Sequence, residues 1–413
     1  MTAPNLAAAP WLREGPLARL LATLDRDGEE ARVVGGAVRN ALLGEAIGDI
    51  DVATTALPAE VTRRAGAAGF KPVPTGIAHG TVTVVVSGRP FEVTTLREDI
   101  ETFGRHANVS FGRDWKADAE RRDFTMNALS LTADGRVHDY VGGLADLAAR
   151  RVRFSGDASK RIAEDYLRIL RFFRFHATYG HNHPDAEGLH ACIAGRAGLE
   201  QLSRERVRME MMKLLTAPHA VPVLASMVEA GILIGVLGGV PYLASFANVT
   251  KLEQALGLPP DPVRRLGALG VYVTEDADRL FQRMRLATAE YMRLTSIADH
   301  WWSMHPGSDR DARAQLYRLG AELFTDRVLV AWARSPANAA DDDWRALATL
   351  PARWVVPVFP LKAADFMNRG VAKGPGLGAA LQTAEEAWIA ADFPHDVSSI
   401  EAIADAAAAG KKD

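Results

Sequence analysis

The order of apolar and polar residues divides the chain into two parts. Up to about residue 150, short apolar runs of strand length alternate with helical patterns. The predicted elements are strands at 31–34 and 49–55, helices at 37–43 and 59–70, and a β-hairpin over 80–97 that turns at 87–90. Residues 97–120 are polar and weakly periodic, which predicts a long loop.

Beyond that loop, ERRDFTMNALSL (120–131) predicts the start of a helix, and 136–150 predicts a strand, a turn and a helix. After about residue 150 strand patterns nearly vanish. Helices are predicted at 158–179, 185–196, 203–216, 219–231 and 378–391. The pattern therefore predicts an α+β fold, with a mixed sheet and its helices followed by an all-helical remainder.

Composition sets broad limits on this picture. The 413 residues are 48% hydrophobic and carry a net charge of −3, so the whole chain is not a basic nucleic-acid binder. The charge is unevenly distributed, since residues 151–218 hold 12 Lys and Arg against 8 Asp and Glu. This excess is compatible with a local phosphate-binding surface in the middle of the chain.

Cysteine content and the lack of an apolar targeting or spanning segment indicate the compartment. Cys192 is the one cysteine, so no intrachain disulfide can form and a reducing compartment is expected. The N-terminus lacks a basic segment followed by an apolar run, and the uncharged stretch 230–247 is interrupted by glycines and a proline. We expect a cytoplasmic protein without a membrane partner.

Gly35 and Gly36 stand between a predicted strand and a predicted helix. Glycines allow a ligand to approach the backbone closely, and free N–H groups at a helix start can hold phosphate oxygens. Arg39, in the first turn of that helix, could donate to the same phosphates. A simple turn explains the pair of glycines equally well.

Asp49 and Asp51 are one residue apart in the second predicted strand. Residues i and i+2 of a strand project from the same face, so both carboxylates should point into one volume. A divalent cation would remove their repulsion, and two Mg²⁺ ions could serve an attacking hydroxyl and a leaving pyrophosphate. The alternative is an exposed edge strand. Glu92, on a later strand, is either a third carboxylate ligand or a surface cross-strand partner.

The stretch 120–129 places Arg122 and Asp123 ahead of apolar residues. Arg122 is either a triphosphate contact or one of several charges around a helix N-terminus, with Asp123 or Thr125 as its cap. Asn127, within an apolar stretch, needs a hydrogen-bond partner if it is buried and could order the site.

Another charged series lies in EDYLRILRFFRF (164–175). Asp165, Arg168, Arg171 and Arg174 recur every three residues among apolar and aromatic side chains. Such a helix cannot turn all its arginines to bulk water, so they line a cleft or form a ladder of salt bridges.

Base chemistry suggests a use for the first two of these residues. Cytosine and adenine both carry an exocyclic amino group beside a ring nitrogen acceptor, whereas uracil and guanine present a carbonyl and an N–H. An Asp acceptor and an Arg donor one turn apart complement the first pattern. Asp165 and Arg168 could therefore select CTP or ATP, because a wrong base would leave buried polar groups unsatisfied.

Together these stretches resemble the class II tRNA nucleotidyltransferase and poly(A) polymerase family, within the polymerase-β-like nucleotidyltransferases. The similar segments run in order over residues 33–215 and are GGAVRNALLG, GDIDVATTA, TGIAHGTVTVV, FEVTTLRED, ERRDFTMNAL, DYVGG, AEDYLRILRFFRF and LSRERVRMEMMKLL. The resemblance implies a nucleotidyltransferase head or palm (1–150), a nucleotide-selecting neck (151–218), a body (219–305) and a tRNA-binding tail (306–413).

The resemblance also implies roles for single residues. Asp49 and Asp51 would be the metal carboxylates, and Gly36, Arg39 and Arg122 would contact the nucleotide phosphates. Asp165 and Arg168 would select the nucleotide, with Arg171 and Arg174 as further contacts. The expected activity is addition of CMP and AMP from CTP and ATP to the 3′ end of tRNA, with Mg²⁺ as cofactor.

One departure and several rival functions remain at this point. Asn40 stands where the family's first motif usually has Asp, which removes a charge near the phosphates. A poly(A) polymerase, a CC-adding or A-adding enzyme and an inactive RNA-binding homologue are the alternatives. The long 97–120 segment and the acidic C-terminal region favour full CCA addition, and the intact set of charged residues argues against an inactive homologue.

Overall fold

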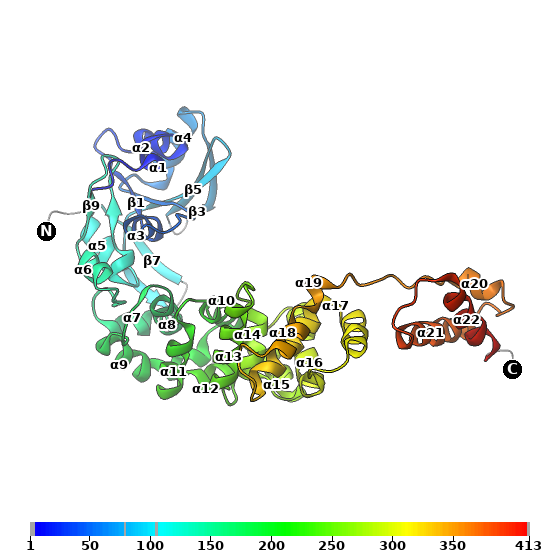
Figure 1. The fold of residues 1–413 in the computed structure, drawn as a ribbon. Coiled ribbons are helices and arrows are strands. Elements are labelled where there is room, and N and C mark those ends of the chain that lie inside the picture. The colour runs from blue at the N-terminus through cyan, green and yellow to red at the C-terminus, as the bar shows by residue number, and fades with distance from the viewer. Residues whose placement is uncertain (1–4, 78–79, 104–105, 411–413) are drawn as a thin grey trace. The chain divides into compact units, whose positions relative to one another are not determined.

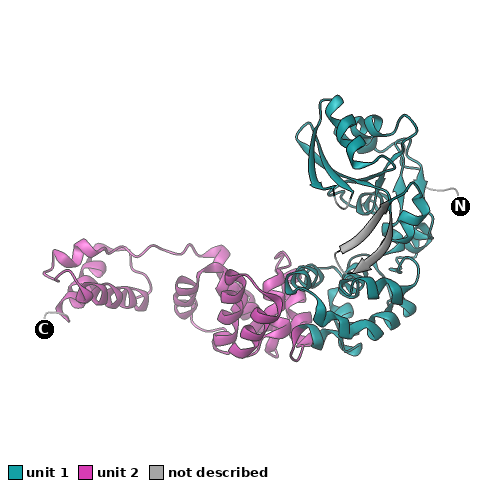
Figure 2. Cartoon of the chain, turned by 180° about the vertical axis from the view of Figure 1, so that it is seen from behind, with its two compact units in different colours: residues 1–236 teal, residues 237–413 magenta. Residues whose placement is uncertain are grey.

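The computed structural model describes residues 5–77, 80–103 and 106–410, with the backbone alone described between 98 and 110. Its contacts divide the chain into two compact units, residues 1–236 and 237–413, which are coloured separately in Figure 2. The four-part division at residues 150, 218 and 305 stays a prediction. None of the described helices is long and apolar enough to cross a bilayer.

The first unit begins with an α+β head built on a seven-stranded sheet, as the sequence predicts (Figure 1). The strand order is β3-β4-β5-β2-β1-β8-β9. The strands are β1 (Ala31–Val34), β2 (Asp51–Thr54), β3 (Lys71–Gly76), β4 (Thr81–Val86), β5 (Arg89–Thr95), β8 (Ser130–Leu131) and β9 (Val137–His138). Neighbouring strands are antiparallel except for β2 and β5, which run parallel.

Three helices near the N-terminal end of the chain belong to the head. They are α1 (Pro10–Arg13), α2 (Pro16–Leu24) and α4 (Pro58–Ala67), and α2 and α4 pack on each other and on the strands. The apolar stripe of α2 is fully buried, as are Val82, Val84 and Val86 at alternate positions of β4. This two-residue alternation made the hairpin predictable, and its turn consists of Ser87 and Gly88, both with positive φ as a tight hairpin requires.

Two predictions for the head were wrong. Residues 97–120 do not form a loop, because β6 (Arg97–Phe103) and β7 (His106–Phe111) pair into a separate two-stranded sheet and α5 (Trp115–Glu120) follows. The stretch 120–131 does not enter a regular helix either. It forms a single 3₁₀ turn at Thr125–Asn127 and then joins the sheet as β8, since Phe124 is extended and bridges to Phe154. The head ends with α6 (Gly143–Ala148).

The rest of the first unit is helical. Its helices are α7 (Ala158–Glu164), α8 (Leu167–Tyr179), α9 (Ala186–Gly195), α10 (Arg204–Leu215), α11 (Ala220–Glu229) and α12 (Ile232–Leu237), with a 3₁₀ turn at Arg196–Gln201. The predicted continuous helix over 158–179 is interrupted. Asp165 is extended, with φ −157° and ψ 105°, so α7 ends before it and α8 begins two residues later.

The second unit is helical throughout the described residues. Its elements are α13 (Leu243–Ala255), α14 (Pro262–Gly270), α15 (Thr274–Met284), α16 (Thr288–His300), α17 (Asp309–Arg334), α18 (Asp342–Ala348), α19 (Leu350–Arg353), α20 (Ala363–Met367), α21 (Pro375–Ala390) and α22 (Val397–Ala409), with a 3₁₀ turn at Trp301–Ser303.

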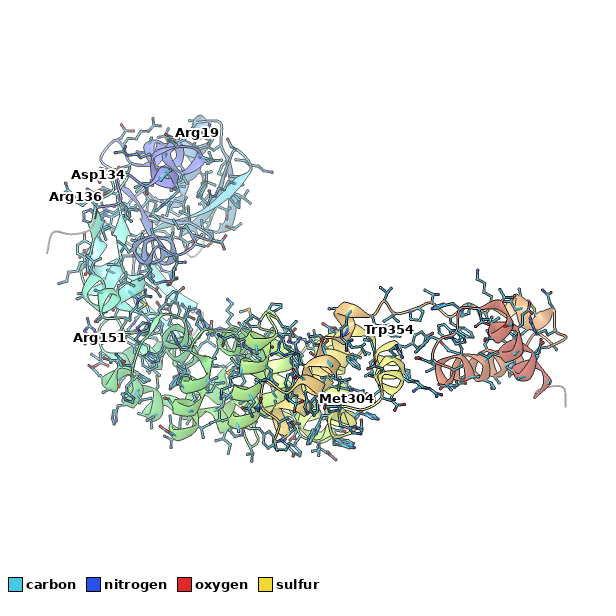
Figure 3. The ribbon with its side chains drawn as sticks, in the orientation of Figure 1. Arg19, Asp134, Arg136, Arg151, Met304 and Trp354 are labelled. Atoms are coloured by element: carbon cyan, nitrogen blue, oxygen red, sulfur yellow. The ribbon has the colours of Figure 1, made fainter. Side chains whose placement is uncertain are left out.

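The long helix α17 has a break inside it. Gly320 has φ 74° and ψ 165°, a conformation that only glycine adopts readily. Before the break, Arg313 pairs with Asp392 at 2.7 Å and Tyr317 packs on Trp388 of α21. Trp354, labelled in Figure 3, packs on Phe393 with 5.1 Å between the ring centroids, and Phe393 also contacts Trp388.

Candidate active site

The two predicted metal carboxylates lie at the start of β2. Asp51 is its first residue, and Asp49 precedes the strand instead of lying within it as predicted. Both are exposed, with the buried Ile50 between them, so the expected alternation still holds. The alternative of an exposed edge strand is wrong, because β2 lies inside the sheet between β1 and β5. The exposed acids at the start of this interior strand remain suited to a ligand.

Glu92 lies beside Asp51 because β2 and β5 pair in parallel with these two residues in register. Loss of hydration and the negative charges of Glu92 and Asp49 raise the pKa of the Asp51 carboxyl, and only Arg122 among its named neighbours opposes them. The described residues contain no three ligand-type side chains already close enough to hold a metal. The carboxylates nevertheless fit a divalent cation, because such a cation would relieve the repulsion that raises this pKa.

Next to these acids, the chain turns from β1 into the helix α3 (Gly36–Leu43). Gly35 has φ 72°, which requires glycine, and an added Cβ there would lie 3.6 Å from the Arg122 guanidinium. The N–H of Gly35 donates to the Leu129 carbonyl at 3.3 Å. The N–H groups that open α3 have no acceptor within the helix and remain suited to phosphate oxygens.

A cavity of ≈ 510 Å³ in the first unit brings seven of the predicted residues together. They are Gly35, Gly36, Arg39, Arg122, Asp165, Arg168 and Arg171, and the lining also includes Asp123, Asn127, Leu167, Phe175 and Arg206. The remaining predicted nucleotide residue, Arg174, is not in the lining. It pairs with Glu210 and lies over the Phe175 ring at 4.4 Å.

Carboxylates that were not predicted hold the cavity's arginines in place. Asp118 accepts from Arg122 at 3.0 Å, and Asp123 accepts from Arg171. Burial would raise the pKa of Asp118 and of Asp123, but the arginine charges outweigh it and lower both. Asp123 is thus neither a helix cap nor a free acid, and it fixes Arg171 in the wall of the cavity.

The predicted base-selecting residues, Asp165 and Arg168, are oriented separately. Arg206 of α10 donates to both Asp165 oxygens, at 3.2 and 2.5 Å, and the N–H of Leu167 donates to Oδ1 at 3.1 Å. Arg168 donates through Nη1 to Glu164 and to the Arg161 carbonyl. Among the described residues, no hydrogen bond uses the Nε and Nη2 groups of Arg168, so these donors can face a ligand.

The sequence of residues 164–175 allows either a cleft lined by arginines or a ladder of salt bridges, and the structure has both. The spacing of Glu164 and Arg168, four residues apart, could have identified that pair. The pairing of Asp165 with Arg206 crosses 41 residues and has no local signal. The predicted need of Asn127 for a partner is confirmed, since its Nδ2 donates to Asp123 at 3.1 Å.

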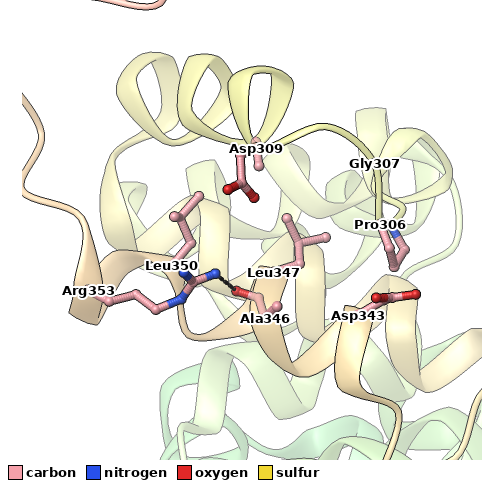
Figure 4. A pocket seen from close by; sticks show the side chains of 9 residues that line it. Pro306, Gly307, Asp309, Asp343, Ala346, Leu347, Leu350 and Arg353 are labelled. Carbon is pink, nitrogen blue, oxygen red and sulfur yellow. Dashed lines mark hydrogen bonds between the residues drawn. The ribbon is translucent and has the colours of Figure 1, made fainter.

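A second cavity, of ≈ 290 Å³, lies in the second unit between the start of α17 and helices α18 and α19 (Figure 4). Arg353 at its edge donates to the Ala346 carbonyl at 2.7 Å, and Asp309 and Asp343 are the acids of its lining. It contains no residue of the predicted site.

Comparisons with known proteins agree with the resemblance stated above. The family model of the poly A polymerase head domain matches residues 31–153, and the model described as the probable RNA and SrmB-binding site of polymerase A matches residues 185–246. The chain is 34% identical over 370 residues to the mitochondrial CCA tRNA nucleotidyltransferase 1 of Mus musculus, covering 88% of this chain and 83% of that protein. It is 30% identical over 404 residues to the CCA-adding enzyme of Latilactobacillus sakei, covering 92% and 95%.

Solved structures are similar over the same length. The CCA-adding enzyme of Bacillus stearothermophilus in complex with CTP has a TM-score of 0.72 and 29% identity, covering 92% of this chain and 94% of that one. The Thermotoga maritima CCA-adding enzyme complexed with tRNA, at 19% identity, has a TM-score of 0.71 over 98% and 99% of the two chains and shares the fold.

Proposed function

Because the chain belongs to the family of CCA-adding tRNA nucleotidyltransferases, we propose that it rebuilds the CCA end of tRNA from CTP and ATP. The observation that carries this proposal is the single cavity that joins the two-glycine turn, Arg122 and the Asp165–Arg168 pair beside the carboxylate of Asp51. The residues proposed for phosphate binding, base selection and nucleotidyl transfer would thus act at one place.

The cavity lining supports a position for the nucleotide. The open N–H groups at the start of α3, with Arg39 and Arg122, would bind the triphosphate. Arg171, held by Asp123, would add positive charge to the same cavity. Burial would lower the pKa of the Arg171 guanidinium, but the charge and hydrogen bonds of Asp123 raise it, so it stays protonated.

Base selection would use the acceptor and donors that the protein leaves open. The Asp165 Oδ2 atom accepts one bond from Arg206 and can accept another from an exocyclic amino group. The open donors of Arg168 would face the ring nitrogen acceptor of cytosine or adenine. Uracil and guanine would place a carbonyl against the Asp165 carboxylate and an N–H against Arg168, which costs affinity.

In the reaction, the terminal hydroxyl of the tRNA attacks the α-phosphorus of the nucleotide. The new O–P bond forms as the bond to the β-phosphate oxygen breaks, the hydroxyl proton is released, and pyrophosphate leaves. Asp49, Asp51 and Glu92 would hold the divalent metal, for which we propose two Mg²⁺ ions. The bound metal would neutralise the developing charge and favour the ionised hydroxyl. The chain's own contribution is mainly positioning.

Two further expectations belong to this proposal. The body and tail, residues 219–413, would hold the acceptor arm of the tRNA. A reducing compartment such as the cytoplasm is consistent with the single cysteine, which is buried. The mitochondrial relatives show that this family is not confined to one compartment.

The decisive experiment offers the purified protein tRNAs that end in the discriminator base, in C or in CC, each with one labelled nucleoside triphosphate. Sequencing of the product ends should show C, C and A added in that order and nothing more. A run of adenosines would indicate a poly(A) polymerase, and arrest after CC, or addition of A alone, a partial enzyme. Binding of tRNA without any incorporation would indicate an inactive homologue.

A further inference from the structure

The arginines that line the ≈ 510 Å³ cavity of the first unit differ in how their charge is balanced. Four of them bond directly to a carboxylate, in the pairs Arg122–Asp118, Arg168–Glu164, Arg171–Asp123 and Arg206–Asp165. Arg39 does not. All the hydrogen bonds of its guanidinium go to uncharged oxygens, although its side chain is only 6% exposed.

Three residues from different segments supply these oxygens. Asn40 Oδ1 accepts from Nε at 3.1 Å and from Nη2 at 2.8 Å, while Asn127 Oδ1 accepts from Nη1. The Tyr179 hydroxyl, at the end of α8, accepts from Nη2 at 2.7 Å, and its ring centroid lies 4.0 Å from the Arg39 Cζ atom. The guanidinium is thereby fixed by α3, by the 3₁₀ turn at Thr125–Asn127 and by α8.

The charge of Arg39 therefore remains available. Burial lowers the pKa of this guanidinium, and Tyr179 and then the carboxylates of Glu45 and Asp123 oppose the shift. The two carboxylates act through space without bonding to it. A buried cation without a bonded anion is unfavourable on its own, and a phosphate entering the cavity would relieve that cost. At the four paired arginines, a phosphate would instead have to compete with a carboxylate for the guanidinium, or share the guanidinium with it.

We propose that Asn40, Asn127 and Tyr179 form a neutral cradle, which fixes the Arg39 guanidinium without neutralising it so that its charge serves the triphosphate. The neutral cradle adds detail to the proposed function and rests on it. Asn40 is the most sensitive position of the cradle, and it is also where this chain departs from the Asp usual in the family's first motif, so the neutral cradle is proposed for this chain and not for the family. An aspartate would keep the two acceptor bonds, but it would bring a full negative charge and lose the Nδ2 donation to the Ala46 carbonyl at 2.9 Å.

The test compares three variants of the full chain. Asn40→Asp adds an anion to the cradle, whereas Tyr179→Phe removes one acceptor without changing the charge. Asn368→Asp, at the exposed residue that caps the C-terminus of α20, makes the same net-charge change in the second unit. Each is titrated with inorganic tripolyphosphate, which has no base or ribose, and each is assayed for the KM of CTP and ATP and for kcat. Circular dichroism melting confirms that all three fold.

Asn40→Asp should weaken tripolyphosphate binding and raise both KM values about tenfold, with a flatter dependence on salt because the site has lost net charge. Tyr179→Phe should change them less than threefold, and Asn368→Asp should change nothing. Equal effects of Asn40→Asp and Tyr179→Phe would overturn the charge argument, as would unchanged binding in Asn40→Asp. If wild-type protein binds tripolyphosphate but never extends tRNA, the proposed function fails while the cradle stands.

Discussion

Two networks of arginines and carboxylates, one in each unit, use the same chemistry to different ends. In the second unit Asp326 is fully buried and accepts from Arg264 at 2.9 Å and from Arg293 at 2.7 and 3.0 Å. Glu253 accepts from Arg264 and Arg265 in the same core. These bonds join α13, α14, α16 and α17 in a network that lines none of the described cavities.

In the first unit five arginines line a cavity of ≈ 510 Å³, and four of them are paired with carboxylates. The fifth, Arg39, has no bonded anion among the described residues. The comparison shows that a cluster of arginines is not by itself a binding site. What distinguishes the cavity is that donors, acceptors and net positive charge are left over after the protein's own bonds are made. Four perturbations should separate the two networks.

The largest effect is expected for Asp51→Ala. Loss of a metal carboxylate should reduce kcat for nucleotide incorporation by on the order of 10³-fold or more, while tRNA binding stays measurable. Turnover is measured with labelled CTP, and binding by gel shift at the same magnesium concentration. The control is Asp343→Ala, in the second cavity, which should behave as wild type. Retained turnover in Asp51→Ala would refute the metal assignment.

Asp326→Ala should act on stability instead. It leaves Arg264 and Arg293 buried without this partner, which costs roughly 3–5 kcal/mol of unfolding free energy. Urea unfolding measures the change. Glu322→Ala removes the exposed partner of the same Arg293 and should cost no more than about 1 kcal/mol. The folded fraction of Asp326→Ala should select nucleotides as wild type does, and altered selection there would erase the contrast between the networks.

The double variant Asp165→Ala with Arg168→Ala should relax the choice of base. We expect the preference for C and A over U and G to fall by about 10- to 100-fold, which corresponds to two lost hydrogen-bonding groups. Misincorporation assays with single nucleotides provide the measurement. Arg206→Ala, which leaves Asp165 in place but removes its orienting partner, should give a smaller loss. Unchanged selectivity in the double variant would rule out this pair as the selector.

The smallest expected effect concerns acid sensitivity of the first unit. Burial lowers the pKa of His176, whose Nδ1 atom is buried without a partner in the described structure. Its native pKa is below the unfolded value of about 6.5, so the unfolded chain takes up the proton first. Stability is therefore retained above pH 6.5 and falls as the pH drops below it, by at most about 1.4 kcal/mol per unit.

Urea unfolding at pH 7.5 and 5.5 tests this, with His176→Gln as the variant. The difference between the two pH values should be smaller in His176→Gln than in wild type. His300→Gln, at an exposed histidine of the second unit, is the control variant. An equal pH effect in wild type and His176→Gln would assign the sensitivity to other groups.

Much of the fold was predictable because the head's elements have strong local patterns. The alternation of Val82, Val84 and Val86 identified one strand, and Gly44, in a left-handed conformation, correctly closed α3. The break at Asp165 was missed because no glycine or proline marks it. The bidentate bond from Arg206 to Asp165, made across 41 residues, accompanies this extended conformation and has no local signature.

The same limit applies to the candidate site. Seven of its residues were named from the sequence and share one cavity, since their types already suggest phosphate and base chemistry. Their roles stay predictions. The carboxylates Asp118 and Asp123 and the hydroxyl of Tyr179 were missed as orienting partners because each is ordinary in its local sequence. Only the tertiary fold shows that Arg39 meets Tyr179, 140 residues further along the chain.

The parallel pairing of β2 with β5 has an evolutionary consequence. Asp51 and Glu92 are neighbours because of backbone register, although the connection between their strands includes α4, β3 and β4. Insertions or deletions in the turn at Ser87 and Gly88, or in the loop before α4, can therefore accumulate without moving one carboxylate relative to the other. A change in the length of these peripheral connections would leave the spacing of the two acids as the sheet register sets it.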